Sequence, residues 1–511
     1  MHTKNRPLLK WFSIGLLIIA PFTCKNSIAQ NAFTRSTKGI EYHIGLESTF
    51  SHGYTPLWMT ANRYGLSSVE SNNGLIRIGI EKESNKDSLK NWRFGYIMDV
   101  AAAYKHTSTA IIHQMAANID YKVLSLSIGA KEEPMAMKNQ ELSSGSQTFG
   151  INARPIPQIK LSIPEYTCIS GKKHPWAAIK GFIGYGILTD GKFQQDYVSP
   201  VQRYSRKVLY HSKAGYLRLG NEKKFPLTFE GGLEMAGQFG GTIYNFDLGY
   251  GVLSKPIHMS HNLKDFLDIT LGTGSDPTDG YYLNATGNTV GSWLFRLNYK
   301  GKNWRASVYY DHYFEDHSQL FFEYGWFDGL IGVEVQLPKN RWISNAVYEF
   351  MKTTYQSGPL YHDHTDAVPD QISGNDKYYN HGLYAGWQHW GQAIGNPLFT
   401  SPLYHPNGSL EFCYNRFKAH HVGFNGKPLK GVHYRFLYSF ERNWGTYDKP
   451  LEHSITNHSL LLETTYTPQR IGKWNTNGWE FGLNFAFDHG QLLGNNTGFQ
   501  IKISKTGLLT H

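Results

Sequence analysis

Long hydrophobic runs are nearly absent from this sequence of 511 residues. After an apolar run at residues 11–22, no stretch approaches the roughly 20 apolar residues that a membrane-spanning helix needs. The pattern therefore excludes a helical membrane protein. Acidic and basic residues are also scarce, at 18% of the chain, and linkers or low-complexity runs that would divide the chain into domains are missing.

The first 29 residues have the parts of a secretory signal peptide. A basic start through Lys10 precedes the apolar run at residues 11–22, and Ser27-Ile28-Ala29 supplies the small residues of a cleavage site. We predict cleavage after Ala29, which leaves residues 30–511 as a single domain. Because the basic residues of this exported chain are dispersed, nucleic-acid binding is not expected.

Cysteine is the rarest chemistry-bearing residue, with three in the chain. Cys24 lies in the predicted signal, and the preceding Pro21-Phe22-Thr23 is a poor match to the small residues that lipoprotein processing needs. Cys168 and Cys413 would then remain in a compartment where a disulfide can persist. The sequence leaves open whether these two pair.

What the sequence has in quantity is alternation of apolar and polar residues. Residues 479–488 alternate without an error, and a strand places such residues on opposite faces. About 20 candidate strands follow the same rule. They lie near residues 42–50, 75–82, 92–104, 110–121, 123–131, 146–152, 157–163, 176–188, 207–220, 226–238, 264–272, 292–300, 303–313, 329–337, 344–355, 380–390, 410–422, 431–443, 457–467, 477–488 and 497–504.

Composition supports an all-β chain. Aromatic residues reach 15%, with 33 Tyr, and there are 52 Gly, as expected for many strands joined by turns and bordered by interfacial aromatic rings. A soluble β-sandwich or propeller shares this bias. With an export signal and segments of about ten residues, the sequence favours a transmembrane antiparallel β-barrel of 16 to 20 strands in the bacterial outer membrane.

The longest connections are the expected places for ligand contact, since long loops of such barrels usually face outward. They cover residues 131–146, 237–263 and 356–380. The last one carries His362, His364 and Asp366, whose side chains are of metal-ligand type, although a solvated polar loop is the commoner meaning. Asp276 and Asp279 are of calcium-ligand type, but a turn rich in Asp and Gly is again commoner.

Enzymatic chemistry and cofactor binding find little support. No Gly-x-Ser-x-Gly elbow is present, although a triad assembled from distant strands would be invisible in a sequence. The start at Gly272-Thr273-Gly274 fails the dinucleotide fingerprint because Pro277 stands where its third Gly belongs. We expect no cofactor and no catalysis, with an outer-membrane hydrolase as the remaining alternative.

The residue types present favour carbohydrate binding over catalysis. Flat aromatic rings stack on the apolar faces of sugars, while amides and charged groups bind the hydroxyls. Both kinds gather after the longest loop, where the candidate glycan-binding residues are Trp387, His389, Trp390, Gln392 and Asn396. The competing interpretation is that such aromatics lie at the membrane interfaces, where barrels need them.

Residues 143–164 carry a resemblance to a known family. The segment runs from a Ser-Gly turn into Asn152-Ala-Arg154-Pro155-Ile-Pro157 and resembles the corresponding segment of the capsule-assembly Wzi family. Further stretches resemble the Bacteroidetes branch of that family; they are residues 63–68, 213–216 and 230–234. The resemblance implies a barrel of about 18 strands with short periplasmic helical elements, acting as a lectin that holds capsular polysaccharide at the cell surface.

The matched motif itself has a modest physical meaning. Pro155 and Pro157 remove two ladder donors, which indicates an edge, a bulge or a kink. We expect Asn152, Arg154 and the two prolines to be structural, with Arg154 paired to an acid inside the barrel.

The sequence therefore predicts an outer-membrane barrel that binds surface or capsular polysaccharide and helps attach the capsule. The alternatives are a porin or transporter for small solutes and an outer-membrane hydrolase. The expected partners are polysaccharide and outer-membrane lipid, including lipopolysaccharide. The net charge of +10 is mild and is explained by solubility or by attraction to acidic glycan or lipid phosphate. The polysaccharide, the oligomeric state and any conduction are left open.

Overall fold

The computed structural model describes most of the chain after the predicted signal peptide. One compact unit extends from Glu41 to Gly507. Gly39, Ile40 and residues 508–510 are the described part of a second unit. The predicted signal peptide and its cleavage site lie outside the described residues, which are 39–84, 91–171, 175–274, 286–315, 326–362, 372–375 and 377–510.

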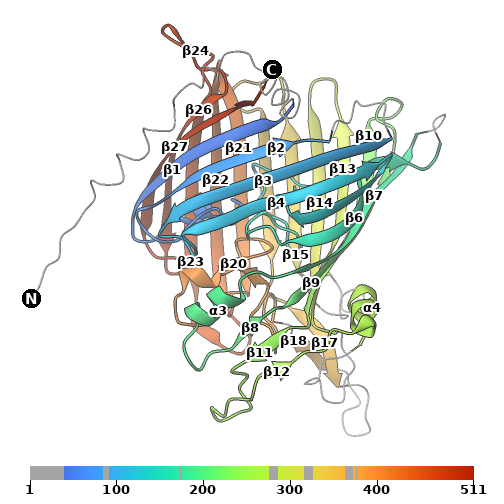
Figure 1. Cartoon of the computed structure of the whole chain (residues 1–511), viewed down its shortest axis with the longest axis vertical. Helices are drawn as coiled ribbons and strands as arrows, with labels where there is room; N and C mark the ends of the chain where they lie inside the picture. Colours follow the sequence, from blue (N-terminus) through green and yellow to red (C-terminus); the bar gives the residue numbers. More distant parts are fainter. Residues whose placement is uncertain are drawn as a thin grey trace, which may run out of the picture. The chain divides into compact units, whose positions relative to one another are not determined.

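The larger unit is a closed antiparallel β-barrel of 18 strands, which confirms the predicted fold class. Each strand pairs with its neighbour in the chain, and β1 closes the barrel against β27 (Figure 1). The strands are β1 (Glu41–His52), β2 (Asn73–Lys82), β3 (Trp92–Tyr104), β4 (Ala110–Tyr121), β5 (Leu124–Ala130), β6 (Gln158–Cys168), β7 (Ala177–Ile187), β9 (Leu209–Leu219), β10 (Leu227–Phe239), β13 (Asn288–Lys300), β14 (Arg305–Glu315), β15 (Gly329–Gln336), β16 (Asn345–Lys352), β21 (Phe417–Leu429), β22 (Val432–Gly445), β23 (Pro450–Tyr466), β26 (Trp479–Gly490) and β27 (Asn496–Leu508).

Alternation along the strands separates an apolar outer face from a polar inner face. In β3 the side chains of Trp92, Phe94 and Met98 are exposed outside, while the next residue, Asp99, is buried inside. Inside, Asp99 accepts a hydrogen bond from Arg77 Nε at 2.7 Å. This arrangement is the one that the two-residue period predicts for a wall with lipid on one side and polar groups on the other.

The two ends of the barrel differ in their connections. At the upper end in Figure 1, neighbouring strands are joined by turns as short as Lys430–Gly431 between β21 and β22. The lower end has the long connections, although a few short turns also occur there, and the longest connection covers residues 353–416 between β16 and β21. We call these the short-turn end and the long-loop end. In bacterial outer-membrane barrels, short turns are periplasmic and long loops extracellular.

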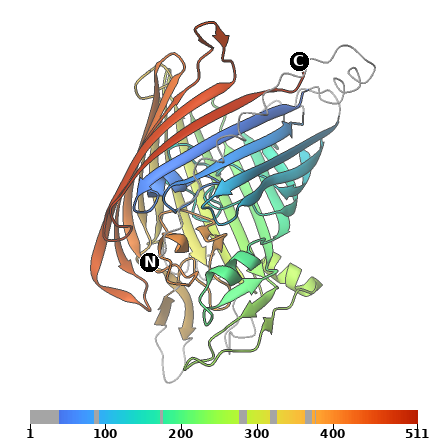
Figure 2. The ribbon, with the colours of Figure 1, turned by 60° about the vertical axis from the view of Figure 1, so that its left-hand side comes forward.

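The long connections contain the smaller elements, which gather at the long-loop end (Figures 1 and 2). A hairpin of β24 (Arg470–Ile471) and β25 (Trp474–Asn475) lies instead in a connection at the short-turn end. The elements of the long-loop end are α2 (Leu57–Thr60), α3 (Gly191–Tyr197), β8 (Tyr204–Arg206), β11 (Thr242–Tyr244), β12 (Ile257–His258), α4 (Leu263–Leu271), β17 (Ser357–His362), β18 (Ile372–Asn375), β19 (Gln388–His389), β20 (Gln392–Ala393) and the 3₁₀ helix η1 (Pro402–Tyr404).

Three of the expected strands are wrong. Residues 146–152 form no strand and lie inside the barrel, and residues 380–390 contain only the two-residue β19. Residues 264–272 are helical because Asn262 caps the start of α4 and Gly272 ends it with φ of 70°. None of the described helices is long and apolar enough to span a membrane.

Candidate functional site

The connection between β5 and β6, residues 131–157, enters the barrel instead of extending outward. We call it the plug segment. The side chains of Ser144, Ser146 and Thr148 are fully buried, although serine and threonine are usually exposed. The Ser144 hydroxyl accepts a hydrogen bond from Asn396 Nδ2 at 3.2 Å, and the Thr148 hydroxyl has a partner on the inner wall. The expectation that residues 131–146 form an outward-facing loop is therefore wrong.

Glu349 of β16 is one anchor of the plug segment. Its carboxylate accepts hydrogen bonds from Ser143 Oγ at 2.6 Å and from the backbone N–H of Ser144 at 2.7 Å. Tyr309 of β14 donates a third at 2.6 Å. Three donors around one buried carboxylate satisfy its oxygens without an ion pair and fix the height of the plug segment in the barrel.

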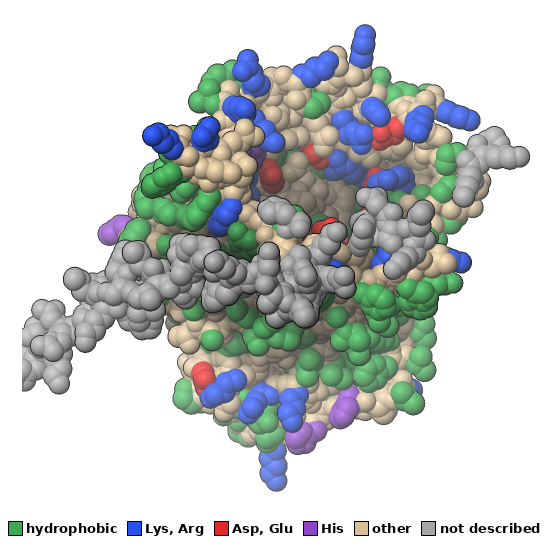
Figure 3. Space-filling view, turned by 45° about the horizontal axis from the view of Figure 1, so that its top comes forward, with side chains coloured by type: hydrophobic (Ala, Val, Ile, Leu, Met, Phe, Trp, Pro, Cys, Tyr) green, Lys and Arg blue, Asp and Glu red, His purple; other side chains and the backbone are tan. Residues whose placement is uncertain are grey.

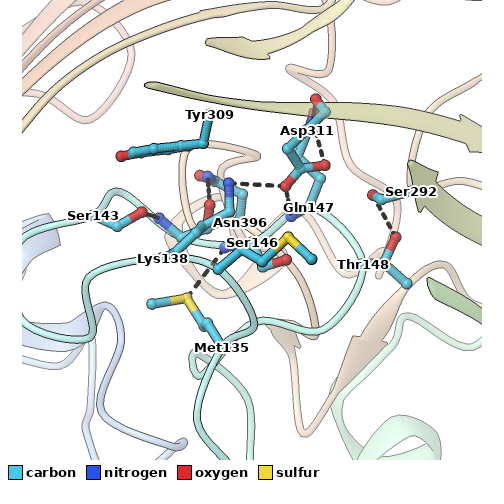
Figure 4. Close-up of polar contacts among 12 residues, drawn as sticks. Met135, Lys138, Ser143, Ser146, Gln147, Thr148, Ser292, Tyr309, Asp311 and Asn396 are labelled. Carbon is cyan, nitrogen blue, oxygen red and sulfur yellow. Dashed lines mark hydrogen bonds and ion pairs between the residues drawn. The ribbon is translucent and has the colours of Figure 1, made fainter. Parts of the chain in front are cut away.

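Asp311 of β14 is the second anchor (Figure 4). Its carboxylate lies 2.9 Å from Lys138 Nζ, and both side chains are almost completely buried. Gln147 donates to the Asp311 backbone carbonyl at 2.7 Å, and Thr148 Oγ1 lies 2.8 Å from Ser292 Oγ on β13. Breaking one partner of such a buried pair leaves a charge in an apolar setting, so the plug segment is held firmly.

On the long-loop side of these anchors, aromatic side chains fill the lumen. Trp58 of α2, Tyr313 of β14 and Phe417 of β21 are fully buried in one hydrophobic cluster. The loop residues Tyr379 and Phe399 stack within it, with ring centroids 3.8 Å apart. Loops and wall thus share one core, and the described residues close the barrel at this end.

The candidate glycan-binding residues belong mostly to this packed region. Trp387, His389 and Asn396 are fully buried, and Gln392 is 5% exposed. Trp387 Nε1 donates to the Thr148 carbonyl at 3.3 Å, and Asn396 Nδ2 donates to the Gly145 carbonyl at 2.9 Å. Their described contacts are internal and support the plug segment; glycan binding by them stays a prediction.

Trp390 differs from the other four because it is only partly buried. It occupies the turn between β19 and β20 with φ of 57°, and its Nε1 donates to Thr189 Oγ1 at 3.2 Å. The Arg154 guanidinium lies 4.3 Å from the centre of its ring. Phe193 of α3 lies beside it, at 5.6 Å between centroids. The ring is thus held between two neighbours.

Arg154 does not make the expected ion pair. Its guanidinium donates to Thr107 Oγ1 at 2.6 Å and packs on Trp390, and no carboxylate of a described residue lies within 4.0 Å of it. Burial lowers the pKa of Arg154 to about 10. The residue is placed by the close approach of the Gly65 backbone, where a Cβ would collide with Arg154. The cation is therefore stabilised by the indole face.

The rest of the matched motif is structural in its contacts. Asn152 donates from Nδ2 to the Ala393 carbonyl at 3.0 Å and accepts from the Asn62 backbone at 3.1 Å. Pro155 and Pro157 lie in the connection before β6, outside the strands, as their missing donors favour. Asn152 thus links three loops at the closed end.

The remaining candidates from the sequence are the metal-ligand residues and the two cysteines. His362 is the last residue of β17, while His364, Asp366, Asp276 and Asp279 lie outside the described residues. Within the described part of the chain, no group of three or more His, Cys, Asp or Glu is arranged to hold a metal ion. Cys168 and Cys413 are both free.

A solvent-facing surface that the sequence did not reveal lies on the small sheet of β8, β11 and β12. Between β8 and β11, Tyr204 lies opposite Tyr244 and Arg206 lies opposite Thr242. Between β11 and β12, Thr242 lies opposite His258. The two tyrosine rings stack at 4.8 Å with 4° between their planes. These five residues share one face, which we call the tyrosine face, and all are partly or fully exposed.

The opposite face of this sheet explains why it stays in place. Ser205 and Ile243 alternate with the exposed residues and are 2% and 0% exposed. Ser205 donates from its backbone to Gln194 Oε1 of α3 at 2.9 Å. The sequence does contain two alternating triplets here, residues 204–206 and 242–244. Three residues are too few to predict a strand, and the sequence does not show that the two segments pair.

The short-turn end of the barrel is open and charged. A cavity of about 740 Å³ lies on the short-turn side of the plug segment and is lined by residues of that segment and of the inner wall. Arg296 pairs there with Glu334 at 2.7 Å and Arg218 with Glu230 at 2.8 Å. Figure 3 shows this end as a hollow with Lys and Arg around its rim and acidic side chains within. We call it the vestibule.

Comparison with solved structures supports the fold. The chain is similar to Wzi of Escherichia coli, described as an outer membrane protein involved in group 1 capsule assembly and a carbohydrate-binding β-barrel, at 12% identity and a TM-score of 0.55 over 96% of this chain and 90% of that one. It is also similar to OprD of Pseudomonas aeruginosa, at 8% identity and a TM-score of 0.45 over 93% and 96%. A third similar structure is the outer membrane protein opdK of the same organism. Its sequence identity is 9% and its TM-score is 0.44, over 92% of this chain and 98% of that one. No protein-family model and no curated protein matches the sequence. The fold is that of an outer-membrane β-barrel.

Proposed function

We propose that this protein is an outer-membrane barrel that binds surface polysaccharide, without hydrolysing it, and helps attach a capsule to the cell. The observation that carries the proposal is the tyrosine face, a partly exposed aromatic and polar surface at the closed, long-loop end of the barrel. A surface that offers ring edges and faces beside Arg206, Thr242 and His258 suits a sugar, whose rings have apolar faces and hydroxyl rims.

Placement in the outer membrane is supported by the outer wall. Exposed apolar side chains such as Ile76, Leu297 and Ile501 cover it, and soluble proteins rarely expose large contiguous apolar surfaces. At the short-turn end, aromatic pairs face outward, among them Trp92 with Tyr121 at 4.6 Å. Such belts and girdles are what barrels present to lipid and its headgroups.

The closed long-loop end supports binding at the surface more than passage through the lumen. The plug segment is bound to the two anchors of the wall, so a polymer would meet the loops' outer side. The neighbouring fold of Wzi, described as carbohydrate-binding, agrees with this proposal, as does the resemblance of residues 143–164. Polysaccharide chains offer repeated copies of one unit, so weak contacts at many barrels would hold a capsule by multivalency.

The direct test is glycan titration of purified protein with Tyr204→Ala and Tyr244→Ala combined. We expect at least tenfold weaker binding of the cell's own polysaccharide, equivalent to about 1.4 kcal/mol. The matched control is Tyr466→Ala, an exposed tyrosine at the opposite end of the barrel. Unchanged affinity of a folded double variant would reject the tyrosine face as the site.

The cellular test is deletion of the gene, with cell-attached and released polysaccharide measured at equal total synthesis. A shift of polysaccharide from cells to medium is expected. Restoration by the wild type, and not by the Tyr204→Ala/Tyr244→Ala variant, would connect the phenotype to the tyrosine face. Unaltered attachment in the deletion strain would contradict the proposal.

A porin-like function is the second candidate, and the vestibule is the observation that favours it. A charged cavity of about 740 Å³ could accept small solutes at the short-turn end. It predicts conductance of the purified barrel in a planar bilayer, whereas the polysaccharide-binding proposal predicts silence.

A further inference from the structure

Helix α4 is a short helix with well-defined ends. The Asn262 side chain accepts from the backbone N–H groups of Lys264 and Asp265, and the Asp265 carboxylate accepts from the Asn262 N–H at 2.6 Å. Such a capping box contributes about 1 kcal/mol to helix stability. Nine residues would be marginal alone, so α4 depends on what it packs against.

That support is the outer surface of the barrel wall. The Ile269 side chain is 2% exposed and lies so close to Gly237 of β10 that a Cβ there would collide with it. Phe266 packs edge-on against Phe239 of β10 at 5.0 Å and against Tyr185 of β7 at 5.2 Å. Gly237, Phe239 and Tyr185 alternate with lumen-facing neighbours, so they face outward. Figures 1 and 2 show α4 beside the wall at the long-loop end.

The wall beneath α4 carries polar groups that lipid would not tolerate. His211 and Lys213 of β9 point outward, because Tyr210 and Ser212 face the lumen. Lys213 Nζ donates to the Thr270 carbonyl of α4, and Tyr185 OH hydrogen-bonds Thr270 Oγ1. His211 is 1% exposed and its Nδ1 lies 3.1 Å from the Gly184 carbonyl. The helix covers these groups and supplies partners that acyl chains lack.

Helical spacing divides the surface of α4 into three faces. Phe266, Ile269 and Thr270 form the face on the wall. Lys264, Asp265 and Asp268 form a charged face, within which Lys264 and Asp268 pair at 3.5 Å. The third face consists of three leucines spaced by four residues, Leu263, Leu267 and Leu271, which are 85%, 62% and 67% exposed. We call it the leucine face.

The height of α4 along the barrel is set by β7 and β9. Each has 11 residues, and a tilted strand needs about 9 to 11 residues to cross the hydrocarbon layer. The helix covers residues 209–213 of β9, almost half of that strand. Leu217, four residues beyond Lys213 on the same outward face, is exposed. The helix therefore lies beside the long-loop half of β9, and the exposed Leu217 follows on the same outward face.

We propose that the leucine face of α4 inserts among the acyl chains of the outer leaflet, so that the helix is a lipid-contacting part of the barrel's outer surface and not a surface loop. The occupant is membrane lipid because the leucine face continues the apolar belt. The charged face, on another side of the helix, remains toward headgroups and water. The proposal rests on the proposed placement in the outer membrane and is independent of glycan binding.

The test uses nitroxide spin labels in proteoliposomes. The full chain carries Cys24→Ser, Cys168→Ser and Cys413→Ser, with one label at a time at Leu267→Cys, Leu217→Cys or Lys264→Cys. Collision with oxygen reports lipid, and collision with a water-soluble nickel chelate reports water. We expect Leu267 to match Leu217, with oxygen dominant, and Lys264 to show at least several-fold greater nickel accessibility.

The other outcomes are distinct. If Leu217 is in lipid while Leu267 is accessible to nickel, the inference about α4 is wrong and the membrane placement stands. If both are accessible to nickel, the membrane placement itself fails. If Leu267 excludes both reagents and its spectrum shows spin–spin broadening, a second copy of the chain covers the leucine face and the inference is overturned. A label at Leu271→Cys repeats the measurement if the Leu267 variant folds poorly.

Discussion

The two ends of the barrel are built from the same wall and differ in what occupies the lumen. At the long-loop end, aromatic side chains from loops and wall form one buried core. At the short-turn end, the vestibule has a volume of about 740 Å³ and is lined by charged groups paired along the wall. The plug segment separates the two regions. The comparison shows that a barrel of 18 strands is too wide for its own side chains to fill, so long loops must do so.

We expect the largest difference between the two ends to appear when the plug segment is removed. Replacing residues 138–151 by a short Gly-Ser linker should join the vestibule to the outside. The replacement removes Ser143, Gln147 and Thr148, whose side chains bind the plug segment to the wall. We expect single-channel conductance in planar bilayers where the wild type is silent. Shortening the β24–β25 hairpin at the short-turn end is the control and should leave the barrel silent. A conducting wild type would refute the closed lumen.

A sharper test breaks one anchor. Asp311→Ala leaves Lys138 buried without its carboxylate, at a cost of about 3 to 5 kcal/mol to the packed state of the plug segment. Hydrogen exchange of residues 138–148 should rise steeply, while the wall strands at the short-turn end keep their protection. The matched control is Glu222→Ala near the rim, whose partner Arg305 is partly exposed. Equal protection in Asp311→Ala and wild type would contradict the anchor.

A pH change should loosen the long-loop end and spare the other. Burial, with help from Arg203, lowers the pKa of His381 to about 3, and burial also lowers the pKa of His389. Each is neutral when folded and has an ordinary pKa near 6.5 when exposed. Stability is therefore present above pH 6.5 and is lost as the pH falls, by up to about 1.4 kcal/mol per pH unit for each histidine.

Hydrogen exchange of residues 378–405 at pH 7 and pH 5, corrected for intrinsic rates, measures this loss. His381 Nδ1 accepts the Leu383 N–H at 3.0 Å, which protonation prevents. A His381→Gln variant keeps an acceptor and should respond less to pH. An equal pH response in that variant would remove His381 from the explanation.

The smallest expected effect concerns a single hydrogen bond. Thr148→Val preserves shape and leaves Ser292 Oγ without the Thr148 hydroxyl, at a cost of about 1 to 3 kcal/mol. We expect faster exchange confined to residues near 148. Thr148→Ser keeps the hydroxyl and serves as its control. Loss of protection across the whole long-loop end would mean that the core depends on the plug segment more than its many other contacts suggest.

The barrel could be predicted from the sequence because its rule is local. Residues 479–488 alternate over their full length, residues 92–100 place a large apolar side chain at every second position, and both are strands of the wall. Strand prediction from alternation was wrong where the chain leaves the wall. Residues 264–272 read as a strand, but the Asn262 cap and the four-residue spacing of the leucines favour a helix once a wall is there to cover.

The candidate site could be predicted much less well because it depends on contacts between distant segments. Trp387 and Asn396 were chosen for their side-chain chemistry, yet their depth is set by residues 143–148, more than 200 positions away. The tyrosine face needs the pairing of Tyr204 with Tyr244, which the sequence does not show. Trp390 was the one candidate that the structure leaves partly exposed.

The closure of the barrel has a consequence for how the molecule assembles. Every other pair of wall strands is adjacent along the chain, but β1 meets β27, more than 440 residues later. Between the two strands, Gln500 Nε2 donates to Glu47 Oε1 at 2.7 Å and to Thr49 Oγ1 at 2.8 Å. Contacts so remote in sequence carry a large loop-closure cost, so we expect the pairing of β1 with β27 to form late. The loops that fill the lumen would then enter it before the barrel closes.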